Sequence, residues 1–510
     1  MNNVLCALPA APGEDSCIIL PTFAEEGPLA LAPSLAAVIP RLANLPALRD
    51  HDGCSGTLTM CYGNTSPDAR ILATGMGKRA SCTPATLRKN FAAAIKRCGD
   101  LRIASPAYSV ESMELLAEAT GEKKEIVLEE CAAAAHMAAY ACTAYRSQED
   151  MRDNPPPFSP TSLQVLYAGD SRPEWAERAA AIAEAGALGV KRARDLVNGP
   201  PNVVTPAAMA AEAERIAGKY NFACQVLGPD ALTVCGMGAL LCVAKGSREE
   251  PRVISLEYAP PGHEEEDPVI VVGKGITFDS GGISLKPADS LPKMKGDMAG
   301  AAAVLGLFTA IGAAPGVVSR RIVGLMPCVE NMPGGNAARP GDIVIAMSGK
   351  TVEITNTDAE GRLILCDSLA YAQKTWKPAA LVDIATLTGA CVVALGREAA
   401  GLFCDDGKLR EHILACGNSV GERFWHMPLW TDMKEHLKSD TADIANAGGR
   451  EGGAILGAVF LKGFVADSIP WAHLDIAGTG FAAKSSALCP AGGTGFGVRT
   501  LYALARSISL

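Results

Sequence analysis

The sequence predicts an α/β protein of two domains, the larger of which is built around a mainly parallel central sheet. The chain has 510 residues, more than a single hydrophobic core usually organises. Only 5% of the residues are aromatic, whereas 52 glycines and frequent alanines suit closely packed helices and strands. In the C-terminal part, short apolar runs alternate with helical stretches, which is typical of a parallel sheet covered on both faces.

Residues 1–170 are predicted to form a smaller α/β domain. The apolar runs Cys17–Leu20 and Leu163–Ala168 indicate strands, while Ser109–Ala117 and Glu129–Arg146 have helical patterns. No motif in this part of the chain indicates a chemical role.

A long helix is predicted to link the two domains across residues 171–198. Its first residues, Ser-Arg-Pro-Glu from Ser171, are typical of a helix start. The sequence Asn-Gly-Pro-Pro from Asn198 is a strong stop signal. We therefore expect residues 199–510 to form the larger domain, which should hold the chemistry.

Strands and helices alternate in this larger domain. In such sheets the active site lies at the carboxyl ends of the strands, so polar residues directly after each strand are the candidates. The predicted strands are Val253–Tyr258, Val269–Val272, Ile322–Pro327 and Leu381–Ile384, and the helices between them include Ala299–Ala310 and Leu363–Lys374.

Charge and cysteine usage restrict the class of protein. The formal charge of −9 argues against a nucleic-acid-binding surface, and the one basic cluster, Lys191–Arg194, is predicted to be a solvated helix face. The 17 cysteines are scattered without a C-x-x-C pair, which indicates reduced thiols. The N-terminus lacks the features of a signal peptide, and the apolar stretch Cys131–Thr143 is too short to cross a bilayer. The expected location is the cytoplasm, without membrane contact.

The segment from Asn356 to Arg362 places two acids two residues apart. If the segment is extended, Asp358 and Glu360 point to the same face. Two carboxylates that close are unfavourable unless a cation lies between them, and a divalent metal would supply it. Because the motif is short, a turn whose acids face water is the alternative interpretation.

The segment from Val272 to Asp297 adds further charged residues. Asp279 follows a strand through a glycine-rich turn, and Asp297 precedes an apolar helix. Lys274 and Lys286 lie among glycines and apolar residues, where a buried lysine needs an acidic or metal partner. Two divalent ions would balance the four carboxylates of both segments, and oxygen ligands suit Zn²⁺, Mn²⁺ or Mg²⁺.

The sequence disfavours one other kind of protease site and excludes a second. The sequence Asp-Ser-Gly-Gly at Asp279 resembles the nucleophile segment of chymotrypsin-like proteases, but those are all-β, and the strand–helix alternation here argues against Ser280 as a nucleophile. The seven histidines are dispersed and no H-E-x-x-H motif is present, so a thermolysin-like zinc site is excluded.

At these residues the sequence closely resembles the leucyl aminopeptidase family, also called cytosol aminopeptidases. The segments V-G-K-G-I-T-F-D-S-G-G-I-S-L-K-P and N-T-D-A-E-G-R-L-I-L-C-D-S-L-A-Y-A match the defining segments of that family. Shorter matches begin at Asn198, Ala385, Gly448 and Trp471, so the resemblance extends from about Arg194 to Leu504. It implies a dinuclear metallopeptidase domain and release of N-terminal residues, preferably Leu and similar apolar ones, from peptides.

The resemblance also implies a set of metal ligands. Lys274, Asp279, Asp297 and Glu360 would hold the tighter ion, and Asp279, Asp358 and Glu360 a second, more exchangeable one. Zn²⁺ or Mn²⁺ is expected, with Mg²⁺ or Co²⁺ as options at the exchangeable site. The lysine would bind as a neutral amine, because a metal can displace its proton.

Lys286 and Arg362 would be the catalytic pair. By resemblance, a water molecule bridging the metals attacks the scissile carbonyl, Lys286 stabilises the oxyanion, and Arg362 holds a bicarbonate ion that acts as general base. The residues implied to contact the N-terminal side chain are Met294, Thr386, Gly389 and Ala477. An apolar pocket of this kind accepts Leu or Met but discriminates weakly between similar side chains.

Two alternative functions are compatible with parts of this pattern. A two-metal phosphoesterase would use acids and histidines without a ligating lysine, so Lys274 argues against it. A catalytically silent hexameric scaffold or regulatory binding protein is the other alternative, against which the complete set of metal ligands argues. The resemblance further implies a homohexamer whose partners are peptides with a free N-terminus.

Overall fold

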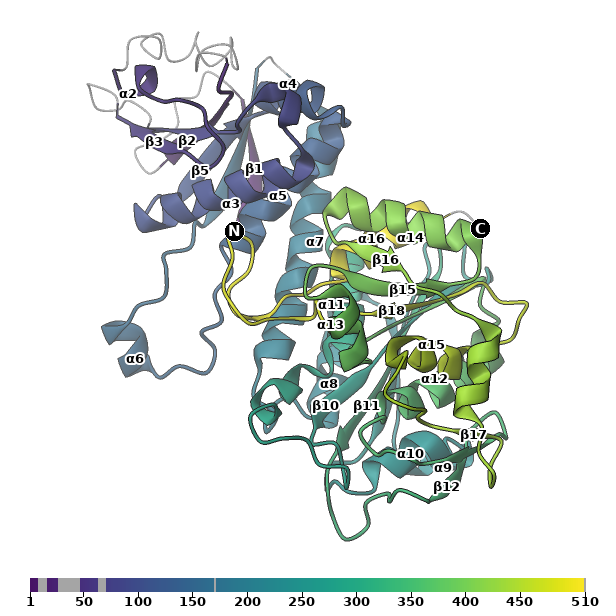
Figure 1. The fold of residues 1–510 in the computed structure, drawn as a ribbon. Helices are drawn as coiled ribbons and strands as arrows, with labels where there is room; N and C mark the ends of the chain where they lie inside the picture. Colours follow the sequence, from purple (N-terminus) through teal and green to yellow (C-terminus); the bar gives the residue numbers. More distant parts are fainter. Residues whose placement is uncertain (8–15, 26–45, 63–69, 169–170, 509–510) are drawn as a thin grey trace. The chain divides into compact units, whose positions relative to one another are not determined.

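The computed structural model describes residues 1–7, 16–25, 46–62, 70–168 and 171–508, and the chain divides into two compact units (Figure 1). The first unit contains Met1–Ala187 and Lys484–Pro490, and the second contains Leu188–Ala483 and Ala491–Leu510. Each unit has its own sheet with helices packed against it, so the predicted architecture of a small and a large α/β domain is confirmed. Helix α7 (Glu174–Asn198) contributes residues to both units.

The first unit is built on a six-stranded sheet. Its strands lie in the order β1 (Asn2–Ala7), β6 (Ser162–Tyr167), β5 (Ser105–Ser109), β2 (Ser16–Thr22), β4 (Arg70–Gly75) and β3 (Leu58–Cys61). Its longer helices are α3 (Pro84–Asp100), α4 (Val110–Thr120) and α5 (Lys124–Ala138). The helix predicted over Glu129–Arg146 ends earlier, at Ala138, because side chains after Met137 are no longer buried in the core.

The second unit contains the larger sheet. Its strand order is β16 (Phe424–His426), β15 (Ala400–Cys404), β18 (Trp471–Asp475), β14 (Ala380–Ala385), β9 (Val269–Gly273), β11 (Ile322–Asn331), β8 (Arg252–Tyr258) and β7 (Ala223–Leu227), and β10 (Gly275–Asp279) pairs with the end of β11. The central strands β18, β14, β9 and β11 are parallel. Antiparallel pairs join β8 to β11, β7 to β8 and β15 to β18, so the sheet is mixed towards its edges.

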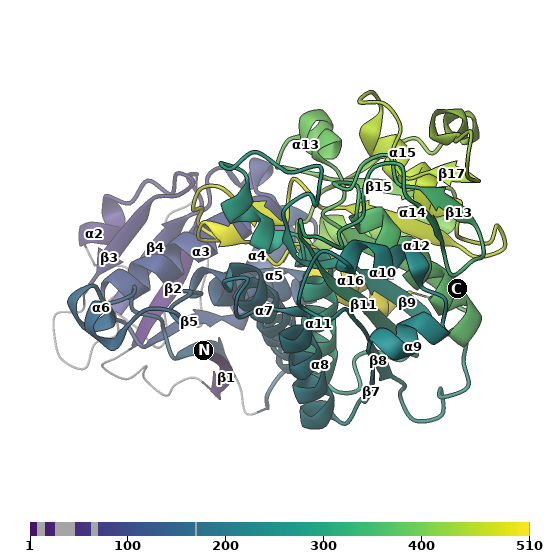
Figure 2. The same ribbon diagram turned by 90° about the horizontal axis from the view of Figure 1, so that it is seen from below.

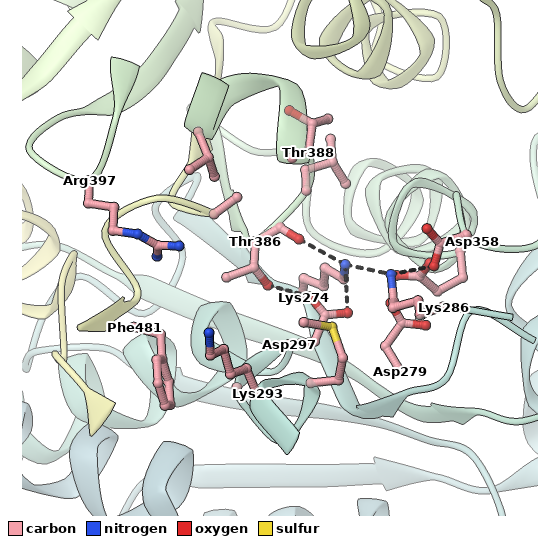
Figure 3. A pocket seen from close by; sticks show the side chains of 17 residues that line it. Lys274, Asp279, Lys286, Lys293, Asp297, Asp358, Thr386, Thr388, Arg397 and Phe481 are labelled. Carbon is pink, nitrogen blue, oxygen red and sulfur yellow. Dashed lines mark hydrogen bonds and ion pairs between the residues drawn. The ribbon is translucent and has the colours of Figure 1, made fainter. Parts of the chain in front are cut away.

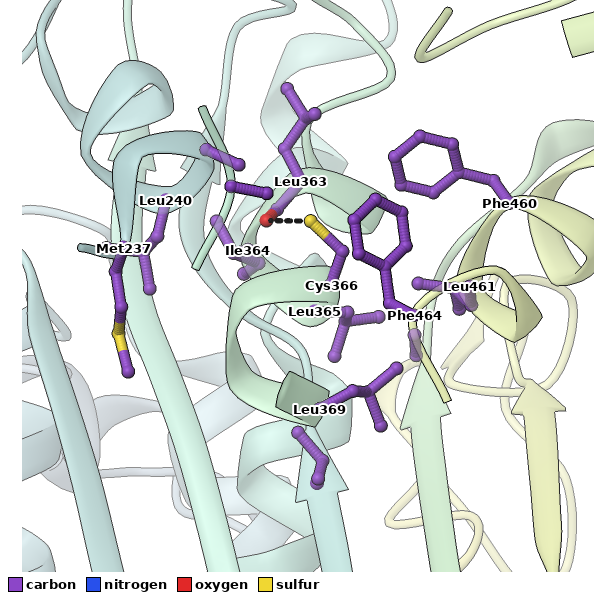
Figure 4. Close-up of a cluster of buried hydrophobic side chains, with 14 of the residues drawn as sticks. Met237, Leu240, Leu363, Ile364, Leu365, Cys366, Leu369, Phe460, Leu461 and Phe464 are labelled. Atoms are coloured by element: carbon purple, nitrogen blue, oxygen red, sulfur yellow. Dashed lines mark hydrogen bonds between the residues drawn. The ribbon is translucent and has the colours of Figure 1, made fainter. Parts of the chain in front are cut away.

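Helices cover both faces of this sheet (Figure 2). On one face lie α8 (Pro206–Tyr220), α11 (Ala299–Ala313) and α16 (Val498–Ser507); on the other lie α10 (Gly238–Ala244), α12 (Gly361–Trp376) and α15 (Gly453–Lys462). The second face has a large apolar core in which Leu363 and Leu369 of α12 join Phe460 of α15 and the neighbouring Phe464 (Figure 4). This core fixes the start of α12 against the sheet.

Helix α11 is the most apolar element of the unit. Together with the preceding 3₁₀ turn it forms a segment, Leu291–Ala313, that is long and apolar enough to cross a membrane, but 89% of its most apolar window is buried. It packs against β9, β11 and β14, as a core helix does. This apolar segment is longer than Cys131–Thr143, the stretch that the sequence analysis judged too short to cross a bilayer.

Three backbone segments meet directly below the end of β9. Lys274 N donates to Ile384 O at 3.0 Å, and Ala301 N donates to Lys274 O at 2.8 Å. A Cβ atom on Gly273 would lie 2.5 Å from Gly300 O, and one on Gly300 would lie 2.1 Å from Ile384 O. Strand β9, helix α11 and strand β14 therefore touch here without side chains between them, which only glycine permits.

The basic cluster in α7 is not the uniformly solvated face that the sequence predicts. Arg194 is only 2% exposed, and its Nε donates to Thr494 O at 2.9 Å. Arg192 pairs with Glu212 at 2.9 Å, and Lys191 pairs with Asp195 at 3.0 Å. Within the second unit, Arg194 is therefore buried, and Lys191 and Arg192 are engaged in ion pairs.

Candidate metal centre

Polar residues gather at the carboxyl end of the central sheet. Lys274 directly follows β9, Asp279 ends β10 and Asn331 ends β11. Thr386 directly follows β14, and Asp475 ends β18. Because these strands run parallel, their ends meet at one edge, which is where open α/β sheets bind ligands.

The second motif is not extended, which was the condition under which its sequence places both acids on one face. Asp358 lies in a turn, and Glu360 is the N-cap of α12 with helical backbone angles of −80° and −35°. The turn is held by Asn446, whose Nδ2 donates to Asn356 O at 2.7 Å. The acids nevertheless converge, since one carboxylate oxygen each of Asp279, Asp358 and Glu360 lies within 4.8 Å of the others.

Lys274 lies between two of the acids (Figure 3). Its Nζ lies 2.8 Å from both Asp297 Oδ2 and Glu360 Oε1 and donates to Thr386 O at 2.9 Å. The side chain is 2% exposed. Burial favours the neutral amine, but Asp297 and Glu360 outweigh it and raise the pKa of Lys274 above its ordinary value.

Lys286 is brought to the same cluster by the glycine-rich turn. Gly281 has a φ of 87°, and a Cβ atom on it would lie 2.4 Å from Ser284 O, so the turn requires glycine. The turn closes through Lys286 N, which donates to Ser280 O at 2.9 Å. Lys286 Nζ then lies 2.8 Å from Asp279 Oδ2 and also pairs with Asp358. Burial opposes the charge on Lys286, yet the three acids Asp279, Glu360 and Asp358 raise its pKa.

Two residues that sequence reasoning missed hold the motifs together. Asn331 Nδ2 donates to Asp279 Oδ1 at 2.9 Å and to Thr357 O at 3.1 Å. Thr357 Oγ1 in turn donates to Gly281 O at 2.7 Å. Asn331 could have been identified from the sequence, because it ends β11. That strand was predicted to end at Pro327, four residues too early.

Ser280 has a structural environment. It is 4% exposed, its hydroxyl donates to Asn331 O at 2.8 Å, and its Oγ accepts from Gly282 N at 3.1 Å. The hydroxyl thus donates to one backbone group and accepts from another, and the two hydrogen bonds stabilise the turn.

The carboxylates fit a cation site. Burial raises the pKa of Asp279, Asp297 and Asp358, and the neighbouring lysines do not offset this effect. Glu360 Oε2 is buried and has no hydrogen-bond partner within the described part of the chain. Divalent ions would stabilise the charged carboxylates and give this oxygen a partner, with Lys274 able to join as a neutral amine.

A cavity of about 320 Å³ opens beside the cluster. Its lining includes the predicted ligands, Lys286 and all the predicted specificity residues: Lys274, Asp279, Asp297, Asp358, Glu360, Lys286, Met294, Thr386, Gly389 and Ala477. Sequence reasoning did not find the remaining lining residues, which are Lys293, Gly296, Leu387, Thr388, Val392, Arg397 and Phe481. Asp475 supports this wall, since it accepts from Thr388 Oγ1 at 2.7 Å and from Ala477 N at 3.1 Å.

Arg362 lines a second cavity of about 260 Å³ that shares Asp358 and Thr388 with the first. Its Nη1 donates to Asn446 O at 2.8 Å, while its Nε is buried without a partner among the described residues. Burial lowers the pKa of Arg362 to about 10, so the guanidinium keeps its proton at neutral pH. A guanidinium that keeps its charge and lines a cavity is suited to binding a small anion.

Comparisons with known proteins cover both units. Residues 191–502 match the model of the cytosol aminopeptidase family catalytic domain, and residues 20–149 match the model of its N-terminal domain. The chain is 50% identical over 482 residues to a probable cytosol aminopeptidase of Nitratidesulfovibrio vulgaris, covering 94% of each chain. It is 48% identical to one of Desulfovibrio desulfuricans, covering 96% of each. Among solved structures, the bottromycin maturation enzyme BotP in complex with Mn is similar, with a TM-score of 0.82 and 34% identity over 97% of this chain and 99% of that one.

Proposed function

Because the chain belongs to the cytosol aminopeptidase family, whose members are metal-dependent aminopeptidases, we propose that it releases single residues, preferably Leu and similar apolar ones, from the free N-terminus of peptides. The observation that carries the proposal is the convergence of one lysine and four acids on a single cavity. An oxygen-rich cluster with one nitrogen ligand suits a pair of divalent ions.

Five residues would hold the two ions. Lys274 and Asp297 would bind one ion, Asp358 would bind the other, and Asp279 and Glu360 would be shared. When bound, Zn²⁺ or Mn²⁺ ions polarise a carbonyl and lower the pKa of water. Lys274 must lose its proton for this, and the same acids that raise its pKa would then be satisfied by the metals.

Lys286 and Arg362 would act alongside the metal ligands. The ammonium of Lys286 lies between Asp279 and Asp358 and lines the cavity, so it can donate to the oxyanion that develops on the scissile carbonyl. Arg362 lines the second cavity and would hold bicarbonate there, and the anion would supply a general base for the reaction.

The N-terminal side chain of the substrate would occupy the first cavity. Met294 and Ala477 offer apolar surface there, while Thr386 is engaged with Asp297 through its Oγ1 at 2.7 Å. Gly389 contributes no side chain, which leaves room for a branched residue such as Leu.

We also infer that the protein acts in the cytoplasm as a homohexamer. The name given to its relatives supports the location. Light scattering coupled to gel filtration should give six chain masses, and a monomer at micromolar concentration would contradict the hexamer.

Hydrolysis of leucine anilide tests the proposed activity. Activity should disappear after chelation, return with Mn²⁺ or Zn²⁺, and be absent with N-acetyl-leucine anilide, because the free amine is needed for binding. Hydrolysis of the blocked substrate would indicate an endopeptidase or esterase. No hydrolysis with any metal would favour the silent scaffold.

A further inference from the structure

Two cations lie at the far end of the first cavity. Figure 3 shows Lys293, Arg397 and Phe481 across the cavity from the pair formed by Lys286 and Asp358. Both cationic side chains are exposed. Within the described ranges of the chain, neither makes a hydrogen bond or an ion pair, so their charges face the cavity and solvent uncompensated.

The backbone holds both cations in place. Lys293 lies in the 3₁₀ helix Leu291–Gly296, next to the specificity residue Met294. Arg397 follows Gly396, which ends α13 (Gly389–Leu395) with a φ of 69° and donates from its N to Val392 O at 2.9 Å.

Arg397 is further anchored beside the predicted specificity wall. A Cβ atom on Gly478 would lie 2.3 Å from Gly396 O, so the two backbones are in direct contact next to Ala477. The position of Arg397 along the cavity is therefore set by rigid backbone contacts, while its side chain is free to reach a ligand.

The charges divide the cavity into two zones. Elsewhere in the lining, Met294 and Val392 provide apolar surface that suits the methylene groups of a side chain. At the far end, Lys293 and Arg397 favour a carboxylate and repel an ammonium or guanidinium. A longer acidic residue such as Glu combines the two requirements.

We propose that this end of the cavity binds the side-chain carboxylate of an N-terminal Glu or Asp, with Arg397 and Lys293 as the specificity-determining residues. The inference rests on the proposed aminopeptidase activity and extends its substrate class from apolar to acidic N-terminal residues. The enzyme then removes Glu in addition to the preferred apolar residues, and removes Lys and Arg poorly.

A carboxylate could also come from the free C-terminus of a dipeptide. Anilides of single amino acids lack that group, so they report on the side chain alone. A comparison of Leu-Gly with Leu-Gly amide reports on the C-terminus alone.

The experiment compares kcat/KM for Glu, Leu and Lys anilides in the wild-type holoenzyme and in Arg397→Glu. In the wild type, Glu should be within about tenfold of Leu. In Arg397→Glu the Glu/Leu ratio should fall by about tenfold or more, as for loss of a charged hydrogen bond, and the Lys/Leu ratio should rise. Lys293→Ala should lower the Glu/Leu ratio by a smaller factor, because it removes one cation without adding an anion.

Arg423→Glu is the matched control, since Arg423 is exposed and outside the lining of the cavity while the change in net charge is the same. It should leave the Glu/Leu ratio unchanged. If the wild type cleaves the Leu anilide but Arg397→Glu and Lys293→Ala keep the wild-type Glu/Leu ratio, this inference is wrong. The proposed function is not affected by that result. If Arg397→Glu instead lowers the Leu-Gly to Leu-Gly amide ratio and spares the Glu anilide, the carboxylate is the C-terminal one and the inference is wrong. No cleavage of any anilide by the wild type would be a failure of the proposed function.

Discussion

Replacing Lys286 with Ala is expected to lower kcat by about 10²–10³-fold, the usual effect of losing one donor to a developing oxyanion, without loss of bound metal. The ammonium pairs with Asp279 and Asp358, two of the proposed metal ligands. Removing a positive charge from between two carboxylates leaves them more available to a cation. Metal affinity should therefore stay the same or increase, whereas kcat should fall.

The measurement is kcat on leucine anilide together with metal content per chain after gel filtration. Lys408→Ala is a suitable control, because Lys408 is exposed on the helix Gly407–Val420 and lines neither cavity. A parallel fall in metal content and turnover would mean that Lys286 supports the metal site and has no separate role in the reaction.

Replacing Glu360 with Gln is expected to abolish activity through loss of metal. Glu360 is 2% exposed, and its Oε2 is buried without a hydrogen-bond partner among the residues that the structure describes. Loss of outer partners of metal ligands already weakens metal binding by about 10–100-fold, so loss of a bridging carboxylate should exceed about 100-fold. The metal-free variant should unfold at nearly the wild-type temperature, because the amide oxygen can still accept from Lys274 and one source of carboxylate repulsion is gone.

Thermal unfolding with and without Mn²⁺ separates these effects. At a metal concentration 100-fold above the wild-type Kd, bound metal stabilises the wild type by about 2.7 kcal/mol, and a variant with a 100-fold weaker site by about 0.4 kcal/mol. Glu411→Gln, which changes an exposed acid outside both cavities, should keep the full stabilisation. Equal stabilisation of Glu360→Gln and wild type would remove Glu360 from the ligand set.

The predicted ligands lie close together in the structure because several of them follow strands. Lys274 directly follows β9 and Asp279 ends β10, so parallel pairing with β11 brings both to one edge of the sheet. The local conformation of Asp358 and Glu360 could not be decided from the sequence, because the start of a helix depends on the core behind Leu363 and on Asn446, which is 86 residues away from Glu360 in sequence.

Other features could not be read from local patterns. Arg194 belongs to a charged run that looks solvated, and only the fold brings Thr494 over it. Lys293 and Arg397 are ordinary surface cations in sequence, and they come together only because the 3₁₀ helix Leu291–Gly296 and the turn after α13 border one cavity. Pairings of this kind arise from tertiary structure, which single-sequence periodicity does not contain.

The direct backbone contact among Gly273, Gly300 and Ile384 has a consequence for engineering new specificities. Any side chain at either glycine would force apart the segments that carry Lys274, and a methyl group at Gly361 would lie 2.7 Å from the Lys274 Nζ. Variant libraries that include positions 273, 300 and 361 would consist largely of inactive or misfolded clones. Positions 293, 294 and 397 line the first cavity, and the side chains at 293 and 397 are exposed, so diversity placed there should change which residue is cleaved while the reaction itself is retained.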